Sequence, residues 1–189
     1  MLVQIKRGAC LKKYQQFPTR TWDKNRKDYI DFYPETYSKY ILTTAHKTFR
    51  GRIGSLGAEI LKIMTKIGHS SLIFIGDEET PWLYRESDFK AAKAALDYLI
   101  HYKLGRRFNG ALEVDARDLP VFVPHLAWLT RCNTVLPYVY FTDPDHNIIG
   151  HICQHGNLHL SFLNFQTEEV FKAHLQHSKL QFLTDTYCS

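Results

Sequence analysis

The feature that most constrains the fold is a series of three short apolar segments near the C-terminal end, separated by two turn sequences. Residues 138–142, 148–153 and 158–163 read YVYFT, IIGHIC and LHLSFL, which are rich in β-branched and aromatic residues. The connecting sequences are DPDH, in which Pro144 has the φ angle of a turn, and QHGN, in which Gly156 can adopt a positive φ. Connections this short join antiparallel neighbours, so the sequence predicts a three-stranded antiparallel sheet.

Helical patterns surround these predicted strands. The clearest is residues 87–103, where apolar residues recur at helical spacing after Ser87, a favourable N-cap. Further helices are predicted at residues 34–48, 56–67, 124–132 and 167–176. A second hairpin is predicted at residues 71–85, around the acidic sequence DEET, and a short strand at GALEV, residues 110–114.

Hairpin strands with helices between and after them predict an α+β fold with a largely antiparallel sheet. We expect one α+β domain over residues 34–189, whose part at 34–68 is helical. Residues 1–33 are expected to form an irregular, basic and aromatic N-terminal arm.

Composition excludes several classes of protein. No apolar run reaches the ~18 residues of a membrane helix, so we expect a cytoplasmic protein without a membrane partner. No Gly-rich phosphate loop is present, and we expect no cofactor. The four cysteines form no Cys-x-x-Cys pair, so we expect them to stay reduced and to bind no stoichiometric zinc.

Positive charge is concentrated at the N-terminal end. The chain has a net charge of +5, yet its first thirty residues contain eight lysines and arginines against two aspartates. Such asymmetry is typical of a surface that binds a polyanion. The predicted nucleic-acid-binding residues are Lys6, Arg7, Lys12, Lys13, Arg20, Trp22, Lys24, Arg26 and Lys27, with Arg50 and Arg52 as a second patch.

The leading hypothesis is therefore a non-catalytic nucleic-acid-binding or regulatory protein that uses this basic N-terminal face. One alternative is an inhibitor or immunity-type protein that docks on an acidic protein partner. Another mode of DNA binding is a winged helix, because residues 34–85 have the order helix, helix, hairpin, with residues 57–67 as the recognition helix. A His-Asn-His nuclease would instead use His146, Asn157 and His174.

The sequence GHICQHGNLHLSF raises the question of a metal site, because His151, Cys153 and His159 are all possible ligands. The answer depends on the register of the hairpin. With a two-residue loop of His155 and Gly156, the first two ligands lie on one face of the sheet and His159 on the other. This register predicts no metal, whereas a three-residue loop would bring the ligands together. It also places Gly150 opposite Ser161, in a gap that we expect a helix to cover, together with His159.

The sequence NLHLSFL resembles one of the two His-apolar-Ser/Thr strand motifs of the 2H phosphoesterase family. The resemblance implies that His159 and Ser161 contact a phosphate and exchange protons with it. The family has a second copy of the motif, for which this chain offers only His46 and Thr48, with Lys47 in place of the apolar residue. The resemblance therefore implies a phosphoesterase or RNA-cleaving enzyme as the catalytic alternative.

Overall fold

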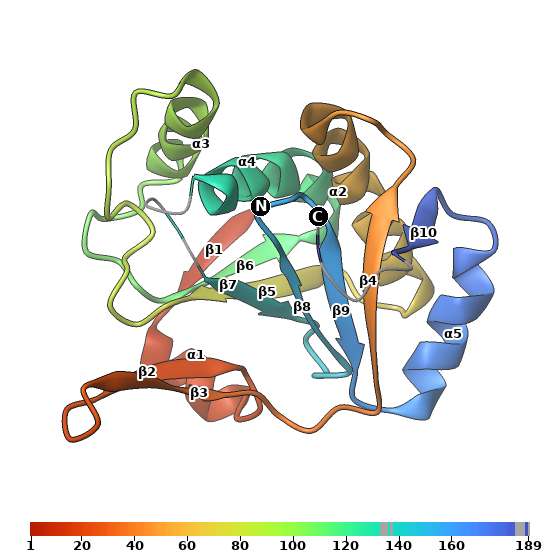
Figure 1. Ribbon diagram of the computed structural model, residues 1–189, viewed down its shortest axis with the longest axis horizontal. Helices are drawn as coiled ribbons and strands as arrows, with labels where there is room; N and C mark the ends of the chain where they lie inside the picture. Colours follow the sequence, from red (N-terminus) through yellow and green to blue (C-terminus); the bar gives the residue numbers. More distant parts are fainter. Residues whose placement is uncertain (133–135, 137, 184–187, 189) are drawn as a thin grey trace.

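The computed structural model describes residues 1–132, 136, 138–183 and 188. The described strands are β1 (Leu2–Ile5), β2 (Thr19–Asp23), β3 (Asp28–Phe32), β4 (Ser38–Thr44), β5 (Ser71–Gly76), β6 (Ala111–Asp115), β7 (Val139–Thr142), β8 (Ile148–Ile152), β9 (Leu158–Phe162) and β10 (Leu180–Phe182). Eight of them form one antiparallel sheet in the order β1-β6-β5-β7-β8-β9-β4-β10, while β2 and β3 form a separate two-stranded ribbon (Figure 1). The predicted α+β class with a largely antiparallel sheet is confirmed.

The described α-helices are α1 (Arg7–Lys13), α2 (Phe49–Lys66), α3 (Lys90–His101), α4 (Leu119–Arg131) and α5 (Phe165–Leu175); the short 3-10 helix η1 (Ala116–Asp118) precedes α4. Helices α2, α3 and α4 lie over one face of the sheet, and α1 and the ribbon lie on the opposite side (Figure 1). Among the described helices, none is long and apolar enough to cross a membrane.

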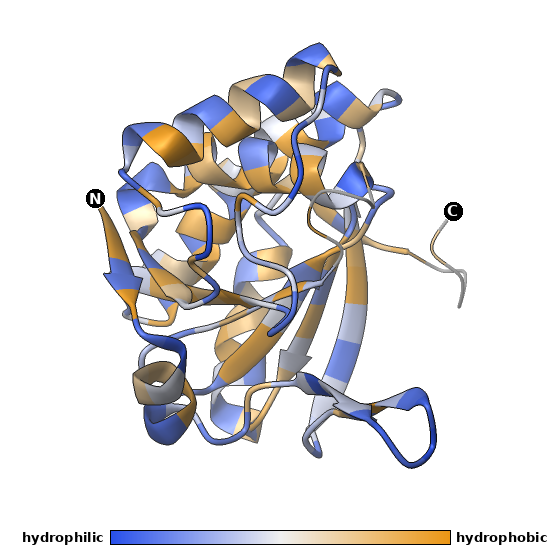
Figure 2. Ribbon diagram, turned by 90° about the vertical axis from the view of Figure 1, so that its left-hand side faces the viewer, coloured by the Kyte–Doolittle hydropathy of each residue, from blue (hydrophilic) through white to orange (hydrophobic). Residues whose placement is uncertain are grey.

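The main core lies between the sheet and the helical layer. In Figure 2 the strands in the middle of the molecule are mostly apolar, whereas polar stretches recur along the helices. Phe74 of β5 packs between Phe122 of α4 and Phe141 of β7, with ring centroids 4.8 and 5.3 Å away. Helices α2 and α4 approach closely at Gly57, where an added Cβ would lie 2.5 Å from the carbonyl oxygen of Leu119. The helical layer thus seals one sheet face, and any ligand of the sheet must use the other.

The opposite face is covered over only part of its width. Cys10, Tyr14 and Phe17, from α1 and the segment after it, pack on Ile73 and Ile75 of β5 in a second, smaller core. The neighbouring strands β7, β8, β9 and β4 present their alternate residues on the same side, and none of the described helices lies over them (Figure 1). We call this area the open face; its central residues are Lys39, Ile41, Tyr140, His151, His159 and Ser161.

Several predicted elements are confirmed. Strands β6, β7, β8 and β9 and helix α3 lie where the pattern indicates. Gly68 has a φ of +83°, as expected for the residue that ends α2. Three helices begin earlier than predicted, and the first of them, predicted at residues 56–67, begins at Phe49 as α2. Leu119 rather than Pro124 begins α4, and Asn164 caps α5 by accepting a hydrogen bond from the N–H of Thr167.

The predicted helix at residues 34–48 is wrong, because this segment contains β4. Tyr40 and Leu42 face the helical layer, whereas Lys39 and Ile41 face the other side. This alternation has the period of a strand. The N-terminal end of α2 is instead fixed by Thr48, whose hydroxyl accepts a hydrogen bond from the N–H of Gly51 (3.1 Å).

The predicted hairpin at residues 71–85 is also wrong beyond its first strand. Strand β5 is paired on both edges, with β6 and with β7, so residues 77–85 have no free edge to join. This segment is instead held by Trp82, which is 1% exposed and donates a hydrogen bond from Nε1 to the carbonyl of Gly110 (2.8 Å). Without a preceding helix and a wing, and with α2 packed against α4, the winged-helix interpretation is wrong.

Residues 1–33 are not irregular as predicted. Strand β1 pairs with β6 at the edge of the main sheet, and α1 buries Cys10 against it. Strands β2 and β3 pair in register from Thr19 opposite Phe32 to Asp23 opposite Asp28. The basic residues of this segment are therefore displayed on regular elements.

Candidate functional site

The histidine-rich hairpin has a register that differs from the predicted one. His151 of β8 lies directly opposite His159 of β9. The loop has three residues, 154–156, and is closed by a hydrogen bond from the N–H of Cys153 to the carbonyl of Asn157 (3.0 Å). A one-residue change of register transfers side chains to the other face of a sheet. The predicted separation of the histidines is thus wrong, and both lie on the open face.

The same change of register explains Gly150. It lies opposite Leu160 rather than Ser161, on the side of the helical layer. A Cβ at this position would lie 2.3 Å from Cζ of Phe141, so the expected gap is filled by an aromatic ring of the adjacent strand. The expectation that a helix covers His159 is wrong, because His159 lies on the face opposite the helices and lines two cavities.

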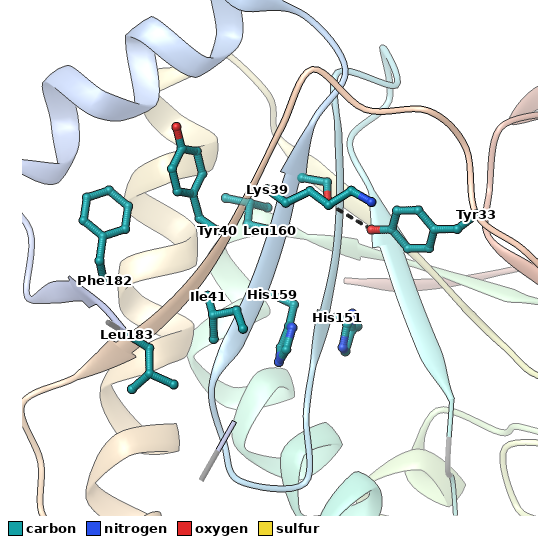
Figure 3. A pocket seen from close by; sticks show the side chains of 10 residues that line it. Tyr33, Lys39, Tyr40, Ile41, His151, His159, Leu160, Phe182 and Leu183 are labelled. Atoms are coloured by element: carbon teal, nitrogen blue, oxygen red, sulfur yellow. Dashed lines mark hydrogen bonds between the residues drawn. The ribbon is translucent and has the colours of Figure 1, made fainter. Parts of the chain in front are cut away.

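Two adjoining cavities hollow the open face. The first, of about 530 Å³, is lined by Tyr33, Lys39, Ile41, Ser161 and Leu183 among others (Figure 3). The second, of about 630 Å³, is lined by Tyr138, Tyr140, Cys153, His155 and Cys188 among others. His151 and His159 line both cavities, so the histidine pair forms their shared wall.

The two histidine rings are stacked. Their centroids are 4.3 Å apart and the planes differ by 18°. Burial, with a smaller contribution from His159, lowers the pKa of His151 to about 3, so its imidazole is neutral at physiological pH. Its Nδ1 is buried and has no hydrogen-bond partner in the part of the chain that the structure describes. The edge of its ring meets Tyr140, with centroids 5.3 Å apart.

Three possible metal ligands converge beside this pair. Donor atoms of Cys153, His159 and Cys188 all lie within 4.8 Å of one another. The Sγ atom of Cys188 is 3.2 Å from Sγ of Cys153 and 3.2 Å from Nε2 of His159. The side-chain amide of Asn157 donates a hydrogen bond to the same sulfur (3.1 Å). These distances bring a residue from the C-terminal end of the chain to the histidine-rich hairpin.

The two thiols are not equivalent. Burial raises the pKa of Cys153, but hydrogen bonds from His159, from Cys188 and from the backbone N–H groups of residues 155 and 157 outweigh it, so that the pKa lies below its ordinary value. Burial raises the pKa of Cys188, and the adjacent charge of Cys153 raises it further. Cys153 is therefore the first of the pair to become a thiolate.

A hydrogen bond connects the open face to the segment after the ribbon. The hydroxyl groups of Tyr33 and Ser161 are 3.0 Å apart (Figure 3). The Lys39 ammonium lies 4.8 Å from the centroid of the Tyr33 ring, and Tyr140 meets the same ring edge-on at 6.1 Å. Burial raises the pKa of Tyr33, so its hydroxyl stays protonated. The part of the open face around Tyr33 therefore combines aromatic rings with the positive charge of Lys39.

The predicted nucleic-acid-binding residues on α1 have two different roles. Lys6 immediately precedes the helix, and Lys12 and Lys13 stand in its last turn; all three are exposed. Arg7, in contrast, donates from Nη1 to the backbone carbonyls of the last residue of β5 (2.9 Å) and of Asn109 (3.2 Å). Arg7 therefore fastens α1 to the sheet, and the three lysines remain available to a ligand.

The ribbon contains the other predicted residues of the N-terminal segment. The Arg20 guanidinium lies between the rings of Tyr29 (4.1 Å) and Tyr138 (4.6 Å) and forms an ion pair with Asp31 (3.5 Å). Trp22 is 41% exposed and meets Tyr29 edge-on at 4.9 Å. The ribbon thus combines a stacked arginine with an accessible indole.

Three further basic residues lie in the turn of the ribbon: Lys24, Arg26 and Lys27. Lys27 has a positive φ of 50°, and Arg26 pairs with Asp23 at 3.7 Å. Arg50 and Arg52 are separate from this group, because they stand in the first turn of α2. The charge of Arg52 acts instead on Cys188, whose thiolate it favours.

The second copy of the 2H motif is not assembled. His46 and Thr48 lie in the connection between β4 and α2, and Thr48 caps the helix. His159 and Ser161 do line the same cavity, as the resemblance implies, but neither member of the second pair lines it.

The His-Asn-His arrangement is not assembled either. His146 lies in the turn before β8 and stacks on Tyr14 (6.1 Å), whereas Asn157 follows the opposite end of that strand. His174 stands on α5.

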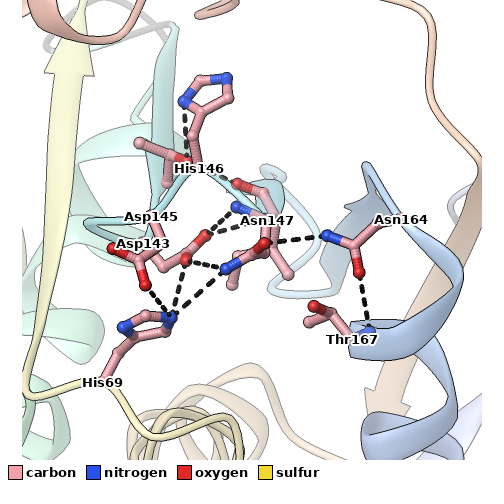
Figure 4. Close-up of polar contacts among 9 residues, drawn as sticks. His69, Asp143, Asp145, His146, Asn147, Asn164 and Thr167 are labelled. Carbon is pink, nitrogen blue, oxygen red and sulfur yellow. Dashed lines mark hydrogen bonds and ion pairs between the residues drawn. The ribbon is translucent and has the colours of Figure 1, made fainter.

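A buried carboxylate fixes the turn that leads into β8. Asp143 accepts hydrogen bonds from the backbone N–H groups of Asn147 (2.7 Å) and Ile148 (2.8 Å), and lies 2.9 Å from Nε2 of His69 (Figure 4). The side-chain amide of Asn147 donates to the same carboxylate (3.0 Å), and its oxygen accepts from Asn164 (2.8 Å). This network sets where β8 begins and hence where His151 lies.

Sequence reasoning missed several residues of the open face, namely Tyr33, Lys39, Tyr140 and Cys188. Strand pairing brings Lys39 and Tyr140 to the open face, and Tyr33 reaches both of them from the segment after the ribbon. Cys188 gives no local signal, because its partners lie about thirty residues earlier. A comparison with known protein families, curated proteins and solved structures finds no match to this chain.

Proposed function

We propose that the chain binds single-stranded nucleic acid across the open face. The observation that supports this best is that the basic N-terminal elements and the aromatic, hollowed half of the sheet share one side of the molecule (Figure 1). The helical layer covers the other side. This arrangement combines the two features that a single strand requires, positive charge for its phosphates and rings for its bases.

The aromatic component consists of rings at the rim and on the walls of the cavities. Tyr138 is 43% exposed, Tyr33 is 37% exposed, and the stacked pair of His151 and His159 lines both cavities. Cavities of about 530 and 630 Å³ are within the usual size of small-ligand pockets, and so can accommodate a base. Stacking on rings tolerates any base, so the binding would have little sequence preference.

The electrostatic component comes mainly from α1. Its basic residues have no acidic neighbour within the helix, whereas on the ribbon Asp23, Asp28 and Asp31 offset much of the positive charge. Lys39 adds a positive charge at the first cavity. A bound strand would place its phosphates near the cations of α1 and the ribbon and its bases near the rings of the open face.

Charge reversal tests the proposal. Replacing Lys12, Lys13, Lys24 and Lys27 by glutamate is expected to weaken binding of a fluorescent oligothymidylate by at least about 100-fold at low salt, because phosphate contacts are replaced by repulsion. For the wild type, the logarithm of affinity should fall steeply with the logarithm of salt concentration, and the slope should decrease by about 3 in the variant. Fluorescence anisotropy measures both quantities.

A matched control reverses four exposed lysines elsewhere: Lys66, Lys90, Lys93 and Lys179. This control should retain most of the wild-type affinity, and thermal unfolding should show both variants folded, because solvated charges contribute little to stability. Equal losses in the two variants would mean that only net charge matters. Failure of the wild type to bind at low salt would contradict the proposal and favour an acidic protein partner. Cleavage of the oligonucleotide would favour the phosphoesterase alternative.

A further inference from the structure

We propose that Cys153, His159 and Cys188 bind one zinc ion at the edge of the open face. The sequence argues against a metal through its lack of a Cys-x-x-Cys pair and through the two-residue loop, but the structure has a three-residue loop and brings the ligands together from separate segments. The observed register places the side chains of Cys153 and His159 on one face of the sheet. Cys188 approaches both from the C-terminal end of the chain.

The donor atoms are those that zinc prefers. Two thiolates and one imidazole form a Cys₂His set, a combination of soft and borderline ligands that selects zinc over magnesium or calcium. In a tetrahedral zinc site with Zn–S bonds of ~2.3 Å and Zn–N bonds of ~2.0 Å, the donors are separated by ~3.5–3.8 Å. The observed separations are 3.2 Å between the sulfur atoms and 3.2 Å from Nε2 of His159 to the Cys188 sulfur. A lengthening of these two separations by about half an ångström would admit the ion, and the third pair, Cys153 and His159, lies within 4.8 Å.

Simple covalent pairing of the cysteines does not account for the cluster. The sulfur atoms are farther apart than the ~2.05 Å of a disulfide bond, and both cysteines are free. A hydrogen bond alone would account for the approach of the His159 imidazole to one sulfur at 3.2 Å, whereas a shared cation accounts for the convergence of all three donors on one point.

The surroundings of the cluster suit a metal site. Asn157 is 1% exposed and donates from Nδ2 to the Cys188 sulfur, the kind of outer contact that orients a thiolate ligand. Its Oδ1 atom and Nδ1 of His151 are buried without a partner among the described residues, so polar capacity remains unused next to the donors. Two thiolates also neutralise a divalent ion, and the site needs no carboxylate.

The fourth coordination position would be open. The cavity of about 630 Å³ is lined by all three ligands, so a water molecule or an anionic group has room beside the ion. Three protein ligands with one open position are the pattern of a reactive rather than a purely structural zinc site. Binding of the ion would release two thiol protons to solvent and would form two Zn–S bonds and one Zn–N bond, with no change of oxidation state.

Cobalt titration tests the site. The full-length, reduced and metal-free protein should bind one equivalent of Co²⁺ and develop the thiolate-to-cobalt charge-transfer absorption and the intense visible bands of tetrahedral cobalt. One equivalent of Zn²⁺ should then abolish these bands. Separate Cys153→Ser and Cys188→Ser variants should lose at least about 100-fold in affinity, more than the usual cost of removing an outer contact.

The matched control is Cys132→Ser, which changes a half-buried cysteine outside the cluster and should leave the cobalt spectrum unchanged. Circular dichroism of each variant establishes that it is folded. A folded, reduced wild type without thiolate-to-cobalt absorption would overturn the proposal, and so would an unchanged spectrum in Cys188→Ser. The titration contains no oligonucleotide, so its outcome is independent of whether the open face binds nucleic acid.

Discussion

Replacing Asp143 by alanine is expected to lower the free energy of unfolding by about 3–5 kcal/mol, the range for removing one member of a buried ionic or hydrogen-bonded pair. Asp143 is fully buried and accepts hydrogen bonds from two backbone N–H groups and from the amide of Asn147. Alanine would leave these donors, and His69, without their acceptor in a dry environment. The β7–β8 turn would lose the contact that fixes the start of β8.

Urea denaturation followed by circular dichroism measures this effect. The matched control is Asp145→Ala in the same turn, whose carboxylate is 74% exposed and lies 3.8 Å from His69. The control should change stability by less than about 0.5 kcal/mol. An Asp143→Asn variant keeps an acceptor for the backbone N–H groups and should fall between the two. Equal effects at positions 143 and 145 would contradict this account of the turn.

Replacing Trp82 by alanine is expected to cost about 3–5 kcal/mol, the usual range for truncating a buried tryptophan. Trp82 is the largest fully buried side chain described, and it is the anchor of residues 77–86, which have no strand to join. Its removal would leave a cavity under this segment and the carbonyl of Gly110 without its side-chain donor.

Trp82→Phe separates the two contributions, because it retains most of the apolar ring and loses the donor. We expect it to cost about 1–3 kcal/mol, the penalty of a buried unsatisfied group. Circular dichroism is the suitable signal, since the substitution removes a fluorophore. Tyr84→Ala, at a position that is 54% exposed, is the control and should have little effect. A stability of Trp82→Ala close to that of the control would show that the anchor is elsewhere.

The elements that sequence predicts correctly are those specified by local chemistry. Strands β7, β8 and β9 are short apolar segments bounded by turn residues, and α3 has a continuous apolar stripe. The apolar pattern of β4 is ambiguous. Tyr40, Ile41 and Thr44 have the spacing of a helix, while Tyr40 and Leu42 have the spacing of a strand. Only pairing with β9 and β10 decides between the two.

The position of Gly156 in the sequence is a local signal for the observed register of the β8–β9 hairpin. Three-residue hairpin loops commonly end with a glycine in the left-handed region, and Gly156 has a φ of +78° as the third residue of such a loop. A two-residue loop that contains this glycine instead places His159 on the face opposite the one observed. The approach of Cys188 has no comparable signal, since it depends on the path of the chain after β10.

For the basic N-terminal segment, the sequence predicts the charge but not which basic side chains are exposed. Its charge is evident from composition, but sequence does not distinguish Arg7, which holds α1 to the sheet, from Lys12 and Lys13, which are exposed. The distinction arises from backbone carbonyls at the ends of β5 and before β6. The burial of Tyr14 and Phe17 in the second core is likewise not evident from composition.

Ultraviolet cross-linking of an oligothymidylate to the full-length protein, followed by mass spectrometry of the cross-linked peptides, tests the central claim most directly. If the open face binds single strands, the cross-links should map to Trp22, Tyr33, Tyr138 and Tyr140, whose rings flank the cavities and the ribbon. Exposed or half-buried rings of the helical layer and its rim, such as Phe89 and Tyr98, should remain unmodified and serve as internal controls. Cross-links confined to those control residues would contradict the claim that the face opposite the helices is the binding surface.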